Sequence, residues 1–316
     1  MSDDEKGMIK IKKRSILLFA FILLFSMAQL SAAASGLGAR ALGMGGAYTA
    51  IADDGTAAYW NPAGITQVNM GLVLNGGLEG DLKLLDAIKN EDPAALDGAF
   101  GLKSGAGLTF KNWAFNAGSD LRATGLGLGG EMMLVERTKQ GMLTYATECT
   151  DLLAFGVNAK YVYVEEESFD LAGSTGKGDG NGFAVDLGAM FTVGKLVRIG
   201  AVLKDYPLAK IQLNGGDYSL PTKIVLGGAV KVPVLGMVAA ADLETPLTDE
   251  GDAVFRVGLE QPFLGILFLR AGGYQVAEDF NFTAGGGLKL GPVTVDLAAD
   301  FGTKDPTVYA TAGFKF

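Results

Sequence analysis

The sequence predicts an all-β fold: a transmembrane antiparallel β-barrel of about 14 strands, with an N-terminal plug segment in its lumen. Three observations support this prediction. After residue 66, segments of about ten residues repeatedly alternate apolar and polar side chains. Glycine is frequent, at 47 residues, in a chain of mean hydropathy +0.28. Short and long connections also alternate along much of the chain, as is typical of barrels in bacterial outer membranes.

The alternation gives each candidate strand a lipid face and a luminal face. In residues 183–191, for example, Phe183, Val185 and Leu187 share one face, while Asp186 lies on the other. An even number of strands places both chain ends on the periplasmic side. A soluble antiparallel β-protein is the alternative interpretation. The candidate strands are 68–76, 106–116, 122–135, 141–148, 151–165, 182–193, 196–205, 222–232, 235–244, 252–261, 264–274, 279–290, 292–302 and 307–316.

The connections indicate which end of the barrel faces the periplasm. Periplasmic turns are expected to be short and extracellular loops longer. In the longest loop, residues 81–90 have apolar residues at helical spacing, which fits either a short helix or a structured surface loop. The predicted periplasmic turns are Cys149-Thr150, Gly194-Lys195, Pro233-Val234, Pro262-Phe263 and Gly291. The predicted extracellular loops are 77–105, 166–181, 206–221, 245–251 and 303–306.

The N-terminus has the pattern of a secretory signal peptide. Basic residues between Lys10 and Arg14 precede an apolar run, residues 16–27, and small residues then offer cleavage after Ala33 or Ala34. A single membrane anchor is the alternative, but a helical span needs about 20 apolar residues. We therefore expect three parts: residues 1–34 as a cleaved signal peptide, 35–66 as a luminal plug, and 67–316 as the barrel.

Composition excludes several classes of function. The formal net charge of −9 argues against a nucleic-acid binder, which needs basic surface to displace counterions. The chain contains no histidine, which excludes Ser-His-Asp catalysis and histidine-ligated metals. Cys149 is the only cysteine, so a cysteine-rich metal site is excluded as well. We expect neither an enzyme nor a cofactor or metal site.

The segment before the strands carries the most distinctive motif. Residues 38–65 have the sequence GARALGMGGAYTAIADDGTAAYWNPAGI, which is too rich in glycine and alanine to form a domain alone. Asp53 or Asp54 is expected to cap a short helix over residues 56–60, which Asn61-Pro62 then ends. Such a segment fits close to another backbone, as a plug inside a barrel does.

This motif resembles the N-terminal signature of the FadL and PorV/PorQ superfamily of outer-membrane barrels. The resemblance implies a barrel of about 14 strands in the outer membrane and an N-terminal segment inside its lumen. The FadL branch moves fatty acids and other hydrophobic small molecules, with lateral exit through the wall. The PorV branch acts in secretion, and the chain is closer to it in size. The matching plug residues are Arg40, Gly43, Gly45, Gly46, Asp53, Asp54, Asn61, Pro62 and Gly64.

Charged residues on the polar faces of the strands are expected to point into the lumen, because Arg or Lys facing lipid at mid-bilayer costs about 2–4 kcal/mol. They either pair with each other and with plug residues, or line a polar conduit. These residues are Lys160, Asp186, Arg198, Arg256, Glu260, Arg270, Asp296 and Asp300. In the last strand, Phe314 and Phe316 fall on the lipid face, and the resemblance implies that the barrel-assembly machinery recognises them. The expected partners are thus membrane lipid, this machinery, and hydrophobic small molecules or secreted proteins.

Overall fold

The computed structural model describes residues 38–80, 99–126, 132–170, 173–194, 196–209, 211–213, 216–218, 220–247, 251–302 and 307–316. The predicted signal peptide and the candidate helix at 81–90 lie outside these ranges. Within the described residues, no helix is long and apolar enough to cross a membrane.

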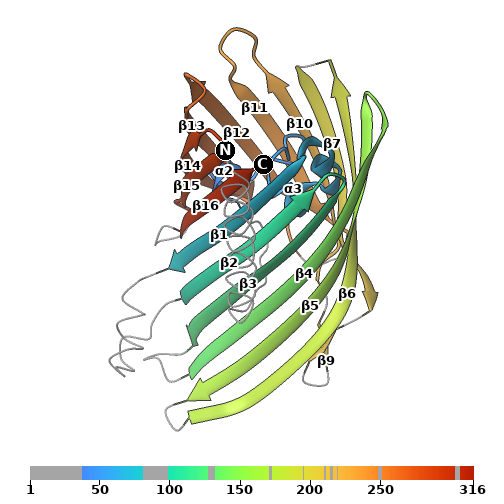
Figure 1. The fold of residues 1–316 in the computed structure, drawn as a ribbon. Coiled ribbons are helices and arrows are strands. Elements are labelled where there is room, and N and C mark those ends of the chain that lie inside the picture. The colour runs from blue at the N-terminus through green and yellow to red at the C-terminus, as the bar shows by residue number, and fades with distance from the viewer. Residues whose placement is uncertain are drawn as a thin grey trace, which may run out of the picture.

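Antiparallel strands form a closed barrel in which β1 pairs with β16, and β7 pairs with β10 (Figure 1). The predicted architecture, an antiparallel barrel of 14 strands, is therefore confirmed. A separate two-stranded sheet, β8 (Ile211–Leu213) and β9 (Gly216–Tyr218), lies between β7 and β10 in the chain. The barrel strands are β1 (Met70–Gly80), β2 (Ala99–Phe110), β3 (Trp113–Leu126), β4 (Met132–Thr150), β5 (Leu153–Asp170), β6 (Gly173–Val193), β7 (Val197–Ala209), β10 (Lys223–Lys231), β11 (Val238–Pro246), β12 (Val254–Phe263), β13 (Leu267–Val276), β14 (Asp279–Leu290), β15 (Val293–Asp300) and β16 (Thr307–Lys315).

The two ends of the barrel differ in their connections. At one end, here called the turn end, short turns join β2 to β3, β4 to β5, β6 to β7, β10 to β11, β12 to β13 and β14 to β15, and β1 begins where β16 finishes. The opposite end, here called the loop end, carries the connection from β1 to β2 and the segment that contains β8 and β9. The strands β4, β5 and β6 extend far beyond the short strands of the opposite wall at this end (Figure 1).

Several predicted boundaries were wrong. The prediction missed the turn at residues 111–112, where Lys111 takes a left-handed φ of 51°, because apolar alternation continues on both sides without a turn glycine. The candidate strand 106–116 is consequently split between β2 and β3, and 122–135 between β3 and β4. Cys149-Thr150 and Pro262-Phe263 also belong to strands, and the turns follow them.

The largest error concerns residues 166–181, which were predicted as a loop. They contribute to β5, which ends at Asp170, and to β6, which begins at Gly173. These segments are rich in glutamate and glycine and show no apolar alternation. Strand pairing beyond the apolar band uses backbone hydrogen bonds, which the pattern of side chains does not reveal.

The outer face of the barrel is apolar, as a wall in contact with lipid requires. Phe115, Leu187 and Phe282 are 59%, 52% and 66% exposed. Inward neighbours are buried, such as Asp186, which confirms the predicted faces of residues 183–191. In β16 the same alternation buries Tyr309 and exposes Val308 and Phe316.

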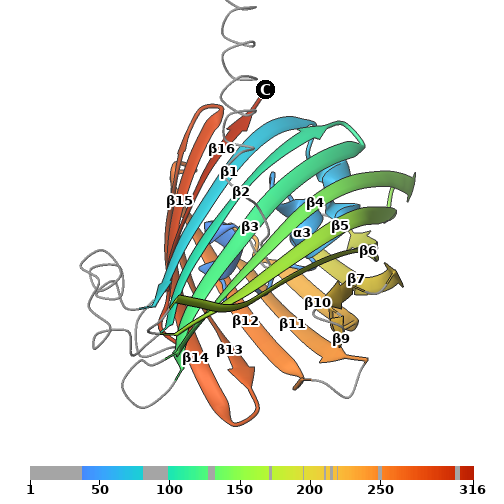
Figure 2. The ribbon, with the colours of Figure 1, turned by 90° about the horizontal axis from the view of Figure 1, so that it is seen from below.

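Residues 38–68, here called the inner segment, lie inside the barrel ring (Figure 2). The segment contains α2 (Ala39–Leu42), α3 (Ala57–Trp60) and the 3-10 helix η1 (Pro62–Gln67). The predicted short helix is present as α3, but the predicted cap was wrong: Thr56 occupies the N-cap, without a side-chain cap hydrogen bond. Asp54 Oδ1 instead accepts a hydrogen bond of 2.8 Å from the Thr56 N–H, one residue before the helix. Asn61 ends α3 and accepts from the Ala63 N–H, which starts η1.

Candidate functional site: the barrel lumen

The inner segment packs against the barrel wall at positions where the wall residue is glycine. Six inward-facing glycines lie against its backbone or its proline. A Cβ at Gly200 would be 2.5 Å from the Thr49 carbonyl oxygen, and one at Gly285 would be 3.1 Å from Gly43 Cα. Backbone therefore approaches backbone, which only glycine allows. This set, here called the glycine layer, is Gly156, Gly188, Gly200, Gly258, Gly272 and Gly285.

The glycines of the inner segment serve the same close approach. Gly45 and Gly46 have φ of +68° and +77°, in the left-handed region that favours glycine. A Cβ at Gly45 would be 2.6 Å from the Gly273 amide nitrogen. Gly64 lies against the Ala52 backbone, so a side chain there would separate the two ends of the segment.

Polar wall residues fasten the segment through its backbone. Asp242 Oδ2 accepts hydrogen bonds of 2.9 and 2.8 Å from the N–H groups of Tyr48 and Thr49. The Asn158 amide donates to the Ala58 carbonyl oxygen at 2.9 Å. Sequence reasoning missed both Asp242 and Asn158 as site residues, although each lies on the inward phase of a candidate strand. The alternation of the strands places both side chains inward, but it does not reveal that they bind the backbone of the inner segment.

Asn61 of the predicted plug motif has three such contacts. Its side-chain amide donates to the carbonyl oxygens of Thr49 and Ala189, at 2.9 and 3.0 Å. Its Oδ1 accepts from the Ala63 N–H at 3.0 Å. Pro62, next in the chain, packs at Gly156 and Gly188. The Asn-Pro pair therefore joins the two halves of the inner segment to β6.

An ionic network links Arg40 of the inner segment to the wall. Arg40 Nε and Nη2 donate to the two carboxylate oxygens of Glu260, at 2.7 and 2.9 Å. Glu260 also accepts from Arg270 Nε at 2.7 Å, and Arg270 Nη1 contacts Asp296 at 2.7 Å. Charges on β12, β13 and β15 are thereby paired around one arginine of the inner segment.

The other side of Arg40 binds acidic residues of the inner segment itself. Arg40 Nη1 lies 2.5 Å from Asp53 and 3.8 Å from Asp54, and Arg198 of β7 lies 3.5 Å from Asp53. Burial by itself would raise the pKa of Asp53, but the Arg40 guanidinium holds that pKa below its usual value. Asp54 in turn accepts a hydrogen bond from the Tyr48 hydroxyl at 2.7 Å.

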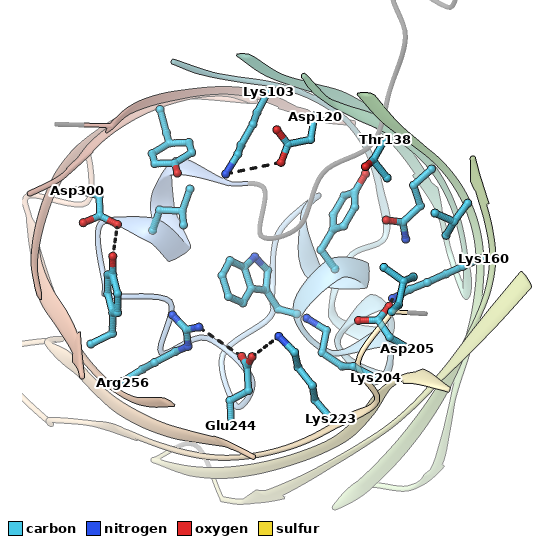
Figure 3. Close-up of a pocket in the computed structure, with 18 of the residues that line it drawn as sticks. Lys103, Asp120, Thr138, Lys160, Lys204, Asp205, Lys223, Glu244, Arg256 and Asp300 are labelled. Carbon is cyan, nitrogen blue, oxygen red and sulfur yellow. Dashed lines mark hydrogen bonds and ion pairs between the residues drawn. The ribbon is translucent and has the colours of Figure 1, made fainter. Parts of the chain in front are cut away.

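A cavity of about 500 Å³ lies in the lumen on the loop side of the inner segment (Figure 3). Leu42, Tyr59 and Trp60 of the inner segment contribute to its lining. Charged and tyrosine side chains from around the barrel make up most of the remainder. This set, here called the charged layer, includes Lys103, Asp120, Arg122, Glu136, Lys160, Lys204, Asp205, Lys223, Glu244, Arg256, Tyr274, Asp300 and Tyr309.

The charged layer contains three of the eight charges singled out in the sequence. Lys160 Nζ is 2.7 Å from both Asp186 and Asp205. Arg256 Nη2 is 3.3 Å from Glu244, which Lys223 also contacts at 2.7 Å. Asp300 accepts from the Tyr274 hydroxyl at 2.9 Å. The others, namely Arg198, Glu260, Arg270 and Asp296, belong to the network around Arg40, while Asp186 is the partner of Lys160.

The wall is irregular beside Lys160. Between the pairs Val185–Tyr206 and Leu187–Leu203, one residue of β6, Asp186, faces two of β7, Lys204 and Asp205. Asp205 has a left-handed φ of 57°, and its N–H donates to Asp186 Oδ1 at 2.8 Å. This is the geometry of a β-bulge, which bends a strand and interrupts its ladder.

An apolar groove of about 570 Å³ lies on the wall next to this irregularity. Phe155, Val157, Leu187, Leu203 and Ile224 contribute to its lining. Residue 203 lines the groove, while residues 204 and 205 line the luminal cavity. The irregularity thus lies between a polar cavity inside the barrel and an apolar groove on it.

Comparison with solved structures finds the same barrel, although no protein-family model and no curated protein matches the chain. The monoaromatic hydrocarbon channel CymD superposes with a TM-score of 0.67 at 14% identity, covering 89% of this chain and 98% of CymD. The Ralstonia pickettii toluene transporter TbuX gives 0.64 at 15% identity, covering 89% and 99% of the two chains. A FadL homologue of Pseudomonas aeruginosa gives 0.61 at 11% identity, with the same coverage as TbuX.

These likenesses cover 89% of this chain and 98–99% of the others, so they concern the barrel as a whole rather than a shared group of strands. At such low identity they show the fold and not the cargo. The chain therefore shares its barrel fold with CymD, TbuX and the FadL homologue.

Proposed function

We propose that the chain is an outer-membrane channel that takes up small hydrophobic molecules at the loop end and releases them sideways through the barrel wall. One observation carries the proposal: the luminal cavity and the apolar groove lie on either side of the β6–β7 irregularity. TbuX, a toluene transporter, and CymD, a monoaromatic hydrocarbon channel, share the fold and support a hydrophobic cargo.

A straight path through the lumen is obstructed in this proposal. The inner segment acts as the plug, and the nine motif residues from Arg40 to Gly64 fix its shape and its contacts with the wall. Its backbone lies against the glycine layer, and we take this contact to block solute. Cargo that reaches the cavity therefore needs another way out.

In this proposal the cargo leaves through the β6–β7 irregularity. Interrupted pairing between β6 and β7 lowers the cost of separating these strands locally, because fewer ladder hydrogen bonds are lost. The groove outside it is apolar, and it opens toward the membrane, where a hydrophobic molecule is more stable than in water. Fatty acids are one class of cargo that this route accommodates.

The proposal also assigns the chain to the outer membrane. Residues 1–34 direct export and are removed, and Phe314 and Phe316 of the last strand are recognised by the barrel-assembly machinery. The apolar outer face supports this location, because such a surface requires lipid.

Uptake into liposomes tests the proposal. Purified protein is reconstituted, and entry of radiolabelled toluene and of a labelled fatty acid is compared with that into protein-free liposomes. Ala189→Trp places a large side chain in the groove, and Ala284→Trp places one on the outward face of β14 as the matched control. We expect the first variant to lose most of the uptake and the second to retain it. Equal uptake with and without protein contradicts the channel, and normal uptake by Ala189→Trp contradicts the lateral route.

A secretion-associated scaffold, as in the PorV/PorQ branch, is the second candidate function. The length of β5 and β6 favours it, because acidic residues such as Glu165 and Glu167 lie on their extension toward the loop end. Crosslinking in intact cells followed by affinity purification is expected to recover an exported protein in stoichiometric amount. A preparation without such a protein contradicts the scaffold.

A further inference from the structure

We propose that the luminal cavity binds a compact organic monocarboxylate, with its carboxylate at Lys204 and its apolar part near Trp60. The inference rests on the proposed function in taking the bound molecule to be cargo, whereas the binding itself can be measured without transport. It differs from the toluene and hydrocarbon cargo of the structural neighbours in requiring one negative charge.

On one side of the cavity, three of the four cations have a carboxylate partner. Lys160 is paired with Asp186 and Asp205, at 2.7 Å each. Lys223 and Arg256 share Glu244, at 2.7 and 3.3 Å. Asp242 lies opposite Arg256 on β11, and its Oδ2 accepts from the backbone of the inner segment. Lys204 is a further cation of this group, and none of these ion pairs includes it.

Lys204 is the fourth cation. In the part of the chain that the structure describes, no carboxylate oxygen lies within 4.0 Å of its Nζ, although all three neighbouring cations have such a partner. Its ammonium instead lies 5.8 Å from the centre of the Trp60 ring. Figure 3 shows the Lys204 side chain directed into the lumen, without a marked ion pair. A desolvated cation without a direct ion pair is costly, and a bound monoanion in contact with it lowers that cost.

The surroundings of Lys204 favour an organic anion over an inorganic one. Trp60, Tyr59 and Leu42 of the inner segment line the cavity on this side, and Val162 and Leu220 line it from β5 and from the segment before β10. A carboxylate with an apolar body satisfies Lys204 and buries part of this surface. Chloride or phosphate provides only the charge.

The rest of the lining limits the length of that body. Across the lumen the cavity is bordered by Lys103, Asp120 and Arg122, which pair with one another or with Glu79. A long acyl chain would cover these charged groups and remove their water without replacing it, which is unfavourable. A ring or a short chain avoids this cost, so we expect a compact ligand.

Fluorescence of Trp60 provides the measurement. Trp113, the second tryptophan, is on the outer surface and is replaced by Trp113→Phe, so the remaining signal reports on the cavity. Purified protein in nanodiscs is titrated with benzoate, with benzamide as the neutral isostere, and with chloride and octanoate. Benzoate is expected to bind at least about tenfold more tightly than benzamide or chloride, and no less tightly than octanoate.

Substitution of Lys204 then locates the carboxylate. Lys204→Met is expected to lower the affinity for benzoate about tenfold and to leave that for benzamide unchanged, whereas Lys204→Arg keeps most of the benzoate affinity. Lys289→Met, on the exposed turn end of β14, is the matched control and binds as the parent does.

The outcomes separate the inference from the proposed function. Equal affinity for benzoate and benzamide, measured in the parent protein without any change at Lys204, overturns the requirement for a charge. Stronger binding of chloride than of benzoate indicates an inorganic anion site and also overturns it, and clearly tighter octanoate binding overturns the compact ligand. Each of these results leaves toluene uptake into liposomes as it was, whereas failure of uptake leaves a measured benzoate affinity intact.

Discussion

The glycine layer and the charged layer are built on the same strands but use opposite kinds of residue. On β5 the wall changes from Gly156 to Lys160 toward the loop end, and on β12 from Gly258 to Arg256. At the level of the glycine layer the inner segment occupies the lumen. The wall has glycine there, so that the backbone of the inner segment can approach the backbone of the strands. In the charged layer the lumen is a cavity, and long charged side chains border it.

The difference teaches that the two layers contribute differently to stability. A close-packed backbone contact has no room to adjust, so any added atom is costly. Charges at the cavity that stay partly exposed, such as Lys223, remain partly solvated, so the loss of one such pair costs little. Stability is therefore expected to depend on the glycine layer and on the pairs that hold the inner segment, while ligand binding depends on the charged layer.

The largest effect is expected from a side chain in the glycine layer. Gly272→Ala places a Cβ against the Met44–Gly45 backbone, and we expect a loss of about 3 kcal/mol or a barrel that does not fold. The measurement is urea unfolding of the barrel in nanodiscs, together with heat-dependent migration on SDS gels.

Gly228→Ala is the matched control, because a Cβ at Gly228 of β10 has nothing within 4 Å. The substitution changes only the β-strand propensity of residue 228, so we expect the unfolding free energy to change by about a few tenths of a kcal/mol. Similar unfolding midpoints for the two variants would show that the inner segment is not packed against the wall as described.

The second effect concerns the network around Arg40. Glu260→Gln keeps the shape of the side chain but removes the charge between Arg40 and Arg270, so two guanidinium groups lose their shared partner. We expect a cost of about 2 kcal/mol in the same unfolding measurement. Glu278→Gln, at an exposed connection, is expected to change nothing. Equal stability of both variants would contradict a structural role for the network.

Much of this fold was accessible from the sequence, for a physical reason. Lipid on one side forces alternation, and this is why Phe183 and Leu187 could be assigned outward and Asp186 inward. Outside the apolar band no such constraint acts. Residues 166–181 consequently gave no sign of the strands they form, and the Lys111 turn was hidden inside a continuous pattern.

The contacts inside the lumen could be predicted from the sequence only in part. The motif around Gly45 and Asn61 pointed to close backbone packing, but the residues that receive it, such as Gly272 and Asp242, are on strands far away in the chain. Their inward direction could be predicted, whereas their partner could not, because it depends on the path that the inner segment takes through the lumen. The same holds for Lys204: unlike Lys160, it has no carboxylate oxygen within 4.0 Å among the described residues, and the sequence does not reveal this.

A smaller effect is expected from Asp53, and it depends on pH. Since Arg40 holds the pKa of Asp53 below its usual value of about 4, the ionised carboxylate stabilises the fold above that pH, and the contribution is lost as the pH falls through the lowered pKa. Asp53→Asn is expected to cost about 1 kcal/mol at neutral pH and almost nothing in strong acid. Unfolding of both proteins across this range measures the difference, and a gap that persists in strong acid would contradict the assignment.

The smallest effect is expected in the charged layer. Lys223 contacts Glu244 at 2.7 Å, but the lysine side chain is about one third exposed, at 32%, and Arg256 remains as a second partner for Glu244. Lys223→Met is therefore expected to change the unfolding free energy by less than about 0.5 kcal/mol. A loss comparable to that of Glu260→Gln would mean that the charged layer also holds the barrel together, and the contrast between the two layers would be lost. If stability is unchanged while benzoate binding shifts, the two layers are separable: one fixes the inner segment, and the other recognises what enters the cavity.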